Sequence, residues 1–367
     1  MNIIYIKKEI WIKKSLKFYE YFINDCFKLK RYHRKNIENN IPYLSICFAA
    51  YNMKNYIEKS ILSILNQSFQ NFEIIIVNDF SNDSTLNIIK KLKLKDKRIK
   101  LINHSKNVGV FNSRVDAVLA SRGKYVILMD PDDMLLNPKL LDKLYKYNLK
   151  YNLDIIEFTV FCYIEKKSEL KIIDKYYHFH NYSYNIINQP ELSNLLYKNT
   201  LTNKYSTVQC RIIWNKIIRK GVLLKALRYI GKDYYKKFFI TAEDTIINLM
   251  CFQFAENYSN IDVPGYMYNI REISMTHGKS DKKKSLLFCY NHLLYFKKLY
   301  FYIKDFNKDR NILYYELLDL NKRLFKLYKL SKKYKNEILF FYNQILNDQY
   351  SSIKFKEVIK NFSSFIK

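Results

Sequence analysis

The feature that most constrains the fold is an alternation of short apolar runs with longer amphipathic stretches, which begins at Tyr43. The apolar runs predict β-strands, and they are LSICFA (44–49), EIIIV (73–77), RIKLIN (98–103), YVILM (125–129) and DIIEFTVF (154–161). The stretches between them predict helices over 56–65, 81–92, 112–120 and 138–147. Strands that alternate with helices form right-handed crossovers and a mostly parallel sheet covered on both faces. We therefore expect a Rossmann-like α/β fold.

Two basic extensions flank this region. Residues 1–42 and 281–367 combine helical spacing of apolar residues with many lysines, and 281–367 holds 19 basic and 8 acidic residues. Either these helices lie on an anionic membrane surface, or their apolar faces pack on the rest of the chain with the lysines in solvent. Between the extensions, we also expect a strand and helix over 211–224 and a helix over 242–254.

The chain is strongly basic. It carries 63 Lys and Arg against 34 Asp and Glu, a formal charge of +29 over 367 residues. Such an excess indicates an anionic partner, for example nucleotide phosphates, nucleic acid or an acidic membrane. The alternative is compositional bias, because Lys, Asn, Ile, Tyr and Phe are abundant while Gly and Pro number only 6 and 5.

The cysteines and the longest apolar runs bear on the compartment. Six cysteines are scattered without a CxxC or Cys/His ligand spacing, which favours a reducing environment. No apolar run approaches the ~20 residues that cross a bilayer, and lysines interrupt the N-terminal residues too often for a signal peptide. We expect a cytoplasmic protein, soluble or peripheral on the inner face of the membrane.

Polar residues follow each of the first four predicted strands. The strands end at Tyr51–Asn52, Asn78–Asp79, Asn103–His104 and Asp130-Pro131-Asp132-Asp133. In an open parallel sheet, ligands bind beyond the carboxyl ends of the strands. Several carboxylates in a partly dry site repel one another unless a cation joins them, and Mg²⁺ or Mn²⁺ completed by phosphate oxygens would do so. Asp and Pro are also ordinary turn residues, so this pattern alone leaves both explanations open.

Three consecutive segments together resemble one family. SICFAAYN, EIIIVNDFSNDST and NVGVFNSRVDAVLASRGKYVILMDPDD are similar to the motifs of family-two glycosyltransferases, which are inverting enzymes with the GT-A fold. The resemblance covers about 44–136 and, more weakly, 207–277. It implies a nucleotide-sugar-binding half over 43–136 and an acceptor-binding half over 137–280, between the extensions 1–42 and 281–367.

The resemblance implies roles for individual residues. Asp79 would read the base of a uridine-type nucleotide, and Arg114 would face the base or a phosphate. Asp130 would lie near the ribose or sugar, and Asp132 and Asp133 would hold the metal. The remaining donor-binding positions are Ala50, Tyr51 and Asn52, which would line the nucleoside pocket, together with Asp132 and with Arg271, which would contact phosphate.

A transferase also requires a catalytic base. Glu243 and Asp244 match the family's acidic pair, and Asp244 would take the proton from the acceptor hydroxyl. Acids at a helix N-terminus also favour the helix dipole, which is the structural alternative. His277 occupies the place of a last metal ligand, and Trp214 either stacks on a sugar or lies in the core.

The chain departs from the family pattern at four positions around the expected nucleotide pocket. Pro, Asp, Gly and Asn are usual where this sequence has, in order, Ala49, Asn78, Phe80 and Asp116. Asn78 lowers the local negative charge, and Phe80 indicates a differently shaped turn beside the base. These departures bear on nucleotide identity more than on catalysis.

The leading hypothesis is a metal-dependent inverting glycosyltransferase of the hexosyl or N-acetylhexosaminyl type. It would use Mn²⁺ or Mg²⁺ and a UDP-sugar, and its acceptor would be a glycan or a lipid-linked molecule in surface polysaccharide or lipooligosaccharide biosynthesis. Alternatives are a basic nucleic-acid-binding protein and a catalytically inactive relative that binds sugar nucleotides. The acids at the strand ends argue against a nucleic-acid partner, which requires a basic groove with aromatics.

Overall fold

The computed structural model describes residues 41–164, 169–171, 186–189, 191–192, 198–199, 204–205, 212–235, 238–239 and 242–271, with 290–291, 294–295, 297–302 and 305–306. Nearly all of the two predicted basic extensions lies outside the described residues, and so does His277. The predictions for them stay predictions.

The first half of the fold alternates strands and helices as predicted. Its elements are β1 (Leu44–Ala50), α2 (Ile57–Leu65), β2 (Phe72–Asn78), α3 (Thr85–Lys95), β3 (Ile99–Asn103), α4 (Val110–Ala120) and β4 (Tyr125–Met129). The four strands pair in parallel in the order β3-β2-β1-β4. The expected α/β fold is confirmed.

One helix begins later than the sequence predicts. The capping-type residues from Ser81 predict a helix from that point, but α3 starts at Thr85. The side chains bind the loop after β1, since Ser81 Oγ accepts from Asn52 N at 3.0 Å and Asp83 Oδ2 accepts from Lys54 N at 3.2 Å. Asp83 Oδ1 also accepts from Thr85 N, at the start of α3, at 2.9 Å. Residues that usually cap a helix here tie two strand ends together.

The second half extends the same sheet. Its main elements are β5 (Met134–Leu135), α5 (Leu140–Tyr151), β6 (Ile155–Ile164), β11 (Lys216–Arg219), α7 (Lys220–Ile230), α8 (Lys232–Tyr235), α9 (Glu243–Phe254) and β12 (Asn257–Ile270). Short strands are β7 (Glu169–Lys171), β8 (Ile186–Asn188), β9 (Lys198–Asn199) and β10 (Lys204–Tyr205). The sheet continues in the order β4-β11-β6-β12-β5, with β11 antiparallel to β4 and β6 and with β6 parallel to β12.

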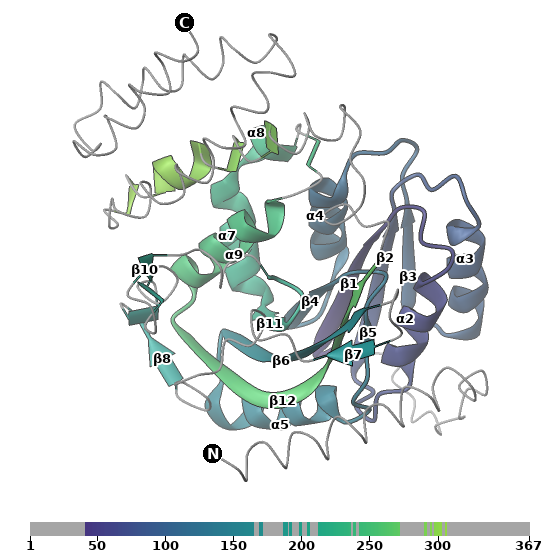
Figure 1. The fold of residues 1–367 in the computed structure, drawn as a ribbon, viewed down its shortest axis with the longest axis horizontal. Helices are drawn as coiled ribbons and strands as arrows, with labels where there is room; N and C mark the ends of the chain where they lie inside the picture. The colour runs from purple at the N-terminus through teal and green to yellow at the C-terminus, as the bar shows by residue number, and fades with distance from the viewer. Residues whose placement is uncertain are drawn as a thin grey trace, which may run out of the picture.

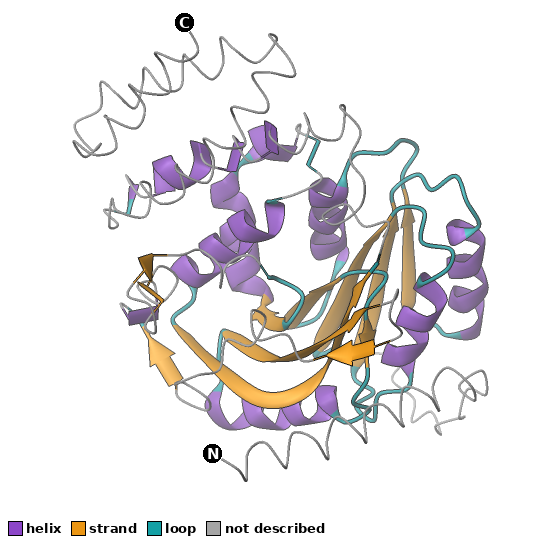
Figure 2. Cartoon of the chain, in the orientation of Figure 1, coloured by secondary structure: helices purple, strands orange, loops and turns teal. Residues whose placement is uncertain are grey.

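Helices cover both faces of the sheet (Figure 1). In β1, Ile46 and Phe48 face α2, α3 and α5, whereas Cys47 faces α4, α7 and α9. Figure 2 shows the strands between these helical layers. The continuous burial of β1, β2 and β4 is what a sheet covered on both sides requires.

Two further sequence predictions are tested in part. Cys47, Cys162 and Cys251, the cysteines among the described residues, are buried free thiols, which is compatible with the expected reducing environment. Across the described part of the chain, no helix has the length and apolar character that a membrane span needs.

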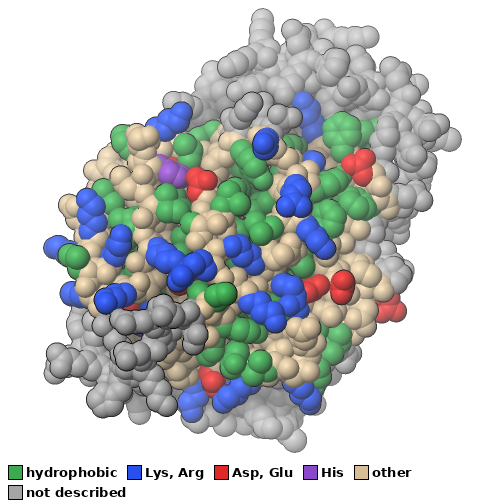
Figure 3. All heavy atoms as spheres, turned by 180° about the vertical axis from the view of Figure 1, so that it is seen from behind, with side chains coloured by type: hydrophobic (Ala, Val, Ile, Leu, Met, Phe, Trp, Pro, Cys, Tyr) green, Lys and Arg blue, Asp and Glu red, His purple; other side chains and the backbone are tan. Residues whose placement is uncertain are grey.

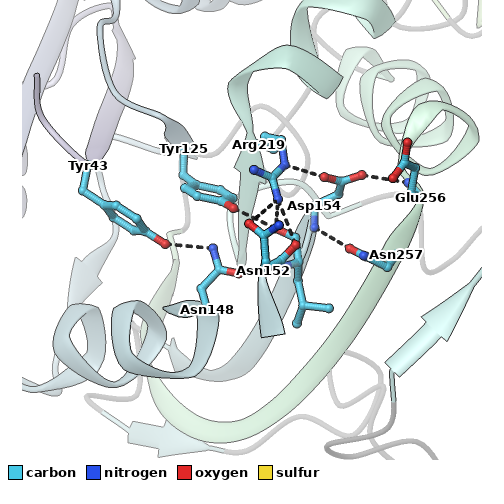
Figure 4. Close-up of polar contacts among 9 residues, drawn as sticks. Tyr43, Tyr125, Asn148, Asn152, Asp154, Arg219, Glu256 and Asn257 are labelled. Atoms are coloured by element: carbon cyan, nitrogen blue, oxygen red, sulfur yellow. Dashed lines mark hydrogen bonds and ion pairs between the residues drawn. The ribbon is translucent and has the colours of Figure 1, made fainter. Parts of the chain in front are cut away.

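A polar network fixes the amino edge of the sheet (Figure 4). Asp154 Oδ1 accepts from Arg219 Nε at 2.5 Å, and its Oδ2 accepts from Glu256 N at 2.8 Å. Arg219 also donates to the carbonyl oxygens of Asn152 and Leu153. We call this the Asp154 network. It joins the ends of β4, α5, β6, β11 and β12. Its members are Tyr43, Tyr125, Asn148, Asn152, Leu153, Asp154, Arg219, Glu256 and Asn257.

Candidate active site

Charged side chains gather at the opposite, carboxyl edge of the parallel strands, where ligands of such sheets bind. We call this group the acidic rim. Its members are Asp130, Asp132 and Asp133 after β4, Glu243 and Asp244 at the start of α9, Arg114 from α4 and Arg271 after β12. None of these side chains is more than 27% exposed. Five acids and two arginines give the rim a formal charge of −3 when all are ionised.

Arg114 lies between the acids of the rim. Its guanidinium group donates to Asp130 Oδ1 at 2.6 Å, to Glu243 Oε1 at 2.9 Å and to Asp244. Its side chain is only 5% exposed. Arg114 therefore holds the start of α9 against the end of β4. The nucleotide contact predicted for this residue stays a prediction.

Asp133 is fully buried and hydrogen-bonded by β12. Tyr266 Oη donates to Oδ2 at 2.5 Å, and Asn269 N donates to Oδ1 at 2.9 Å. Burial raises the pKa of the Asp133 carboxyl well above its usual value, and the neighbours Asp132 and Asp130 raise it further. A protonated or cation-bound carboxyl is the form that this position favours.

Asp132 faces Arg271 across the rim. Arg271 Nε lies 2.6 Å from Asp132 Oδ2, an ion-pair distance. The Arg271 guanidinium also lies 4.9 Å from the centre of the Tyr56 ring. Burial raises the pKa of Asp132 to about 6 even though Arg271 lowers it, and Asp130 adds to the rise.

Glu243 and Asp244 begin α9 in a buried setting. Burial raises the pKa of Asp244 to about 8 against the opposing effect of Arg114, and Glu243 and Asp130 raise it further. Burial also raises the pKa of Glu243, whose Oε2 has no hydrogen-bond partner. The residue before the helix, Ala242, has φ 68°, in the left-handed region that only glycine adopts without strain. Buried acids with raised pKa values are candidates for proton transfer.

The rim fits a divalent cation by charge and donor type. Carboxylate oxygens are hard ligands, which suit Mg²⁺ or Mn²⁺, and the excess of acids over arginines leaves negative charge to balance. In the part of the chain that the structure describes, no three His, Cys, Asp or Glu residues are arranged to hold a metal by themselves. The carboxylates of the rim suit an arrangement in which one or two of them bind the cation and phosphate oxygens complete its coordination.

Asp79 holds the loop that follows β3. Its carboxylate accepts from Val108 N and Gly109 N, each at 2.9 Å, and His104 Nδ1 lies 3.0 Å from Oδ1. The other ring nitrogen of His104 lies 3.0 Å from Asp116 Oδ2. Gly109 is required there, because its φ is 91° and a Cβ would lie 3.0 Å from the Phe239 carbonyl oxygen. The base contact predicted for Asp79 stays a prediction.

The other predicted pocket residues lie at the ends of β1 and β2. Tyr51 and Phe80 are 43% and 53% exposed, whereas Ala50 is buried and its carbonyl oxygen accepts from Asp79 N at 2.8 Å. Asn52 and Phe80 have φ values of 54° and 61°. Left-handed geometry costs a bulky residue about 1–2 kcal/mol, and such strain is common at functional sites.

Trp214 lies in the core rather than at a sugar-binding surface. Its ring stacks on Tyr266 at 4.7 Å and on Tyr268 at 5.0 Å, and it is 4% exposed. This confirms the core alternative. Sequence reasoning missed Tyr266, whose hydroxyl binds a candidate site residue, Asp133. It lies five residues before Arg271 in the sequence, but no sequence pattern indicates that its hydroxyl binds Asp133.

The sequence of this chain is similar to sequences of known proteins. A family model described as "Glycosyl transferase family 2" matches residues 45–226. The uncharacterized glycosyltransferase MJ1057 of Methanocaldococcus jannaschii is 30% identical over 281 residues, which are 72% of this chain and 87% of that protein. An uncharacterized glycosyltransferase of Haemophilus influenzae is 38% identical over 138 residues, 38% of this chain. The match covers 42% of that relative's length.

Among solved structures, residues 1–349 of TarS from S. aureus, crystallised in complex with UDP, align with this chain. The TM-score is 0.47 at 17% identity, over 88% of this chain and 91% of that one.

Proposed function

The chain belongs to glycosyltransferase family 2, and we propose that it transfers a sugar from a UDP-linked donor to a hydroxyl group with inversion at the anomeric carbon. The proposed donor is a UDP-hexose or UDP-N-acetylhexosamine, and the proposed cofactor is Mn²⁺ or Mg²⁺. The observation that carries this proposal is the acidic rim, whose buried carboxylates carry a formal charge that the two arginines do not balance.

The residues of the rim would have different roles in such a reaction. Asp132 and Asp133 would hold the metal, with Arg271 beside them to contact the diphosphate. When bound, the metal supplies positive charge that stabilises the departing diphosphate. Asp244 accepts the proton of the acceptor hydroxyl as that oxygen attacks the anomeric carbon from the face opposite the diphosphate, which inverts the configuration.

Arg114 keeps this proton acceptor in place. It binds Asp244, Glu243 and Asp130 at once, so the base and the donor-binding acids move as one unit. Burial raises the pKa of Asp244 to about 8 although Arg114 opposes the rise, so only a fraction of these carboxyls is ionised at neutral pH, and it is this ionised fraction that accepts the proton. A base with a pKa near the working pH is well matched to this role.

The alternatives find less support. Figure 3 shows Lys and Arg side chains spread among apolar and polar ones over one face of the molecule, as expected for solvated lysines in a basic composition. The best-defined charged cluster is acidic, which opposes nucleic-acid binding. An inactive relative would not need Asp132, Asp133 and Asp244, all of which are present.

The acceptor and the location are proposed from chemistry and charge. We propose a glycan or lipid-linked acceptor in surface polysaccharide or lipooligosaccharide biosynthesis. The enzyme would act in the cytoplasm, peripheral on the inner face of the membrane, where the positive charge of the chain would attract an anionic surface.

A thermal-shift screen of nucleotide sugars with and without Mn²⁺ tests the proposal, because a ligand that binds only the folded protein raises its melting temperature. We expect a UDP-sugar to stabilise the wild type in the presence of Mn²⁺, and Asp132→Asn to remove the metal-dependent part. Stabilisation that is the same with and without Mn²⁺, or stabilisation by single-stranded RNA in place of nucleotide sugars, would contradict the proposal.

A further inference from the structure

A lysine is fully buried where β11 begins. Lys216 is 0% exposed, and its Nζ donates to the Ile212 carbonyl oxygen at 2.6 Å and to Asn215 Oδ1 at 2.8 Å. Glu157 Oε2 lies 3.4 Å from the same ammonium group. A buried charge is costly unless it is paired and hydrogen-bonded, and apolar residues of similar volume often give equal stability. Stability alone therefore does not account for a lysine at this position.

The ammonium group of Lys216 is held in place by three neighbouring strands. Lys216 of β11 lies opposite Glu157 of β6. Glu157 Oε1 accepts from Asn215 Nδ2 at 3.1 Å, and its Oε2 accepts from Tyr258 Oη of β12 at 3.0 Å. The positive charge of Lys216 thus meets the negative charge of Glu157, so this pair needs no added cation, unlike the acidic rim. The pair is a fixed point within the sheet.

The Ile212 carbonyl joins this lysine to α9. It accepts from Asn248 Nδ2 at 2.5 Å as well as from Lys216 Nζ. Asn248 is 0% exposed and lies about one helical turn after Asp244, so the two residues share a face of α9. The same proximity is seen at Cys251, a further turn along that face, because burial raises the pKa of its thiol while the positive charge of Lys216 opposes the rise. Lys216 therefore lies close to the face of α9 that carries Asp244.

We propose that Lys216 is a positioning residue for Asp244; this inference rests on the proposed function. It acts through the Ile212 carbonyl, which fixes Asn248 and with it the first two turns of α9. Arg114 already holds the first turn of α9 from the side of the rim. The bond of Asn248 adds a second fixed point one turn further along, and two points set the rotation of the helix about its axis. A displacement of about 1 Å can slow a reaction about 10²-fold, so this rotation matters for a base that must reach the acceptor hydroxyl.

The other end of α9 offers a matched control. There the side-chain amide of Gln189 donates to the carbonyl oxygens of Phe252 at 2.9 Å and of Ala255 at 2.8 Å. Carbonyl groups at the end of a helix lack partners within the helix, so such bonds stabilise it. They lie about two to three turns beyond Asp244. Gln189 and Asn248 are thus both side-chain amides that tie α9 to a neighbouring segment, but only Asn248 lies near the candidate base.

The test compares Asn248→Ala and Gln189→Ala with the wild type in the release of UDP from UDP-glucose and from UDP-N-acetylglucosamine, with Mn²⁺ and with water as the acceptor. We expect Asn248→Ala to lower kcat about tenfold or more, while the KM for the donor and the affinity for UDP stay unchanged. Gln189→Ala should lower the melting temperature by a similar amount and keep the wild-type kcat. Amide hydrogen exchange in the first two turns of α9 should become faster in Asn248→Ala but not in Gln189→Ala.

A second variant removes the lysine without leaving a buried charge. The double substitution Lys216→Met with Glu157→Gln keeps an acceptor for Tyr258 Oη, but it takes the ammonium donor away from the Ile212 carbonyl. Lys216→Met alone would leave Glu157 charged and without its cation, which is strongly destabilising. We expect the double variant to fold, to show the same fall in kcat as Asn248→Ala and to bind UDP as the wild type does.

The outcomes separate this inference from the proposed function. Wild-type kcat, or wild-type hydrogen exchange at the start of α9, in both Asn248→Ala and the double variant overturns the positioning role alone. A fall in UDP affinity, or an equal fall in kcat in Gln189→Ala, also overturns it, because the disturbance would then be general. A wild type that neither binds UDP with Mn²⁺ nor releases it from either donor overturns the proposed function itself.

Discussion

The two edges of the sheet handle buried acids in opposite ways. At the amino edge, Asp154 meets one arginine, Arg219, and one backbone N–H, from Glu256, and the remaining guanidinium contacts go to carbonyl and amide oxygens (Figure 4). At the carboxyl edge, five acids share two arginines. At the amino edge, the charge of Asp154 is balanced by groups of the chain itself. At the carboxyl edge, the charge of the acids is balanced only when a cation binds.

The difference separates stability from function. A buried ion pair with all its hydrogen bonds made fixes the elements that it joins, and breaking it is costly. A buried cluster with excess charge opposes folding until a ligand enters. The left-handed residues follow the same division, since Asn52, Phe80 and Ala242 flank the acidic rim while Asn152 alone belongs to the Asp154 network. The comparison predicts that substitutions in the acidic rim mainly change activity and that substitutions in the Asp154 network mainly change stability.

The largest effect is expected from Asp244→Asn in the rim. Loss of a general base lowers the turnover rate about 10²–10⁴-fold. Because burial raises the pKa of Asp244 to about 8, the wild-type carboxyl is largely protonated at neutral pH and the neutral amide should cost little stability. Turnover and melting temperature, measured on the same preparations, check both parts. Lost UDP affinity would contradict the assignment of Asp244 as base.

A smaller effect, on stability rather than on turnover, is expected from Asp154→Ala in the Asp154 network. The substitution leaves Arg219 Nε and Glu256 N without their carboxylate partner. Hydrogen bonds to charged groups contribute about 1.5–3 kcal/mol each. Because Arg219 is partly exposed, we expect the low end of the sum of the two, a loss of about 3 kcal/mol in urea unfolding. Turnover per folded molecule should match the wild type. A fall in turnover with normal stability would mean that the two edges are not separate in function.

Much of the fold could be predicted from the sequence, because burial on both faces leaves a continuous apolar run at each central strand. All five strands predicted from 44 to 161 are present within a few residues of their expected ends. The predicted start of α3 was wrong, since Ser81 binds the loop after β1 and Asp83 binds both that loop and Thr85 N, the first residue of the helix. Local sequence patterns do not reveal whether a polar side chain will cap a helix or bind a neighbouring loop.

For the candidate site, the sequence predicted which residues lie near one another but not which side chains bind each other. The strand-end rule placed Asp79 and Asp130 at one edge because the carboxyl ends of parallel strands meet there. It gave no sign that Arg114 would bind Asp244, a residue 130 positions away, or that Tyr266 would bind Asp133. Such pairs depend on how α4, α9 and β12 pack against β4, which no local periodicity encodes.

A further expected effect concerns pH. Burial raises the pKa of Asp132 to about 6 and that of Asp244 to about 8, so the folded state favours their protonated forms more than the unfolded state does. The stability that they contribute is fully present below their ordinary pKa of about 3.9 and is lost as pH rises through 6 to 8. We therefore expect the metal-free protein to melt at a lower temperature at pH 8 than at pH 5.

A divalent cation should remove this dependence, because it favours the ionised carboxylates. Mn²⁺ should accordingly raise the melting temperature more at pH 8 than at pH 5. Histidines titrate in the same range, so the readout is the difference between the wild type and Asp132→Asn, in which the slope should be smaller. Asp154→Ala should melt lower at every pH and keep the wild-type slope. If it flattened the slope instead, the pH dependence would belong to the amino edge, and the rim would not be the place where charge is left unbalanced.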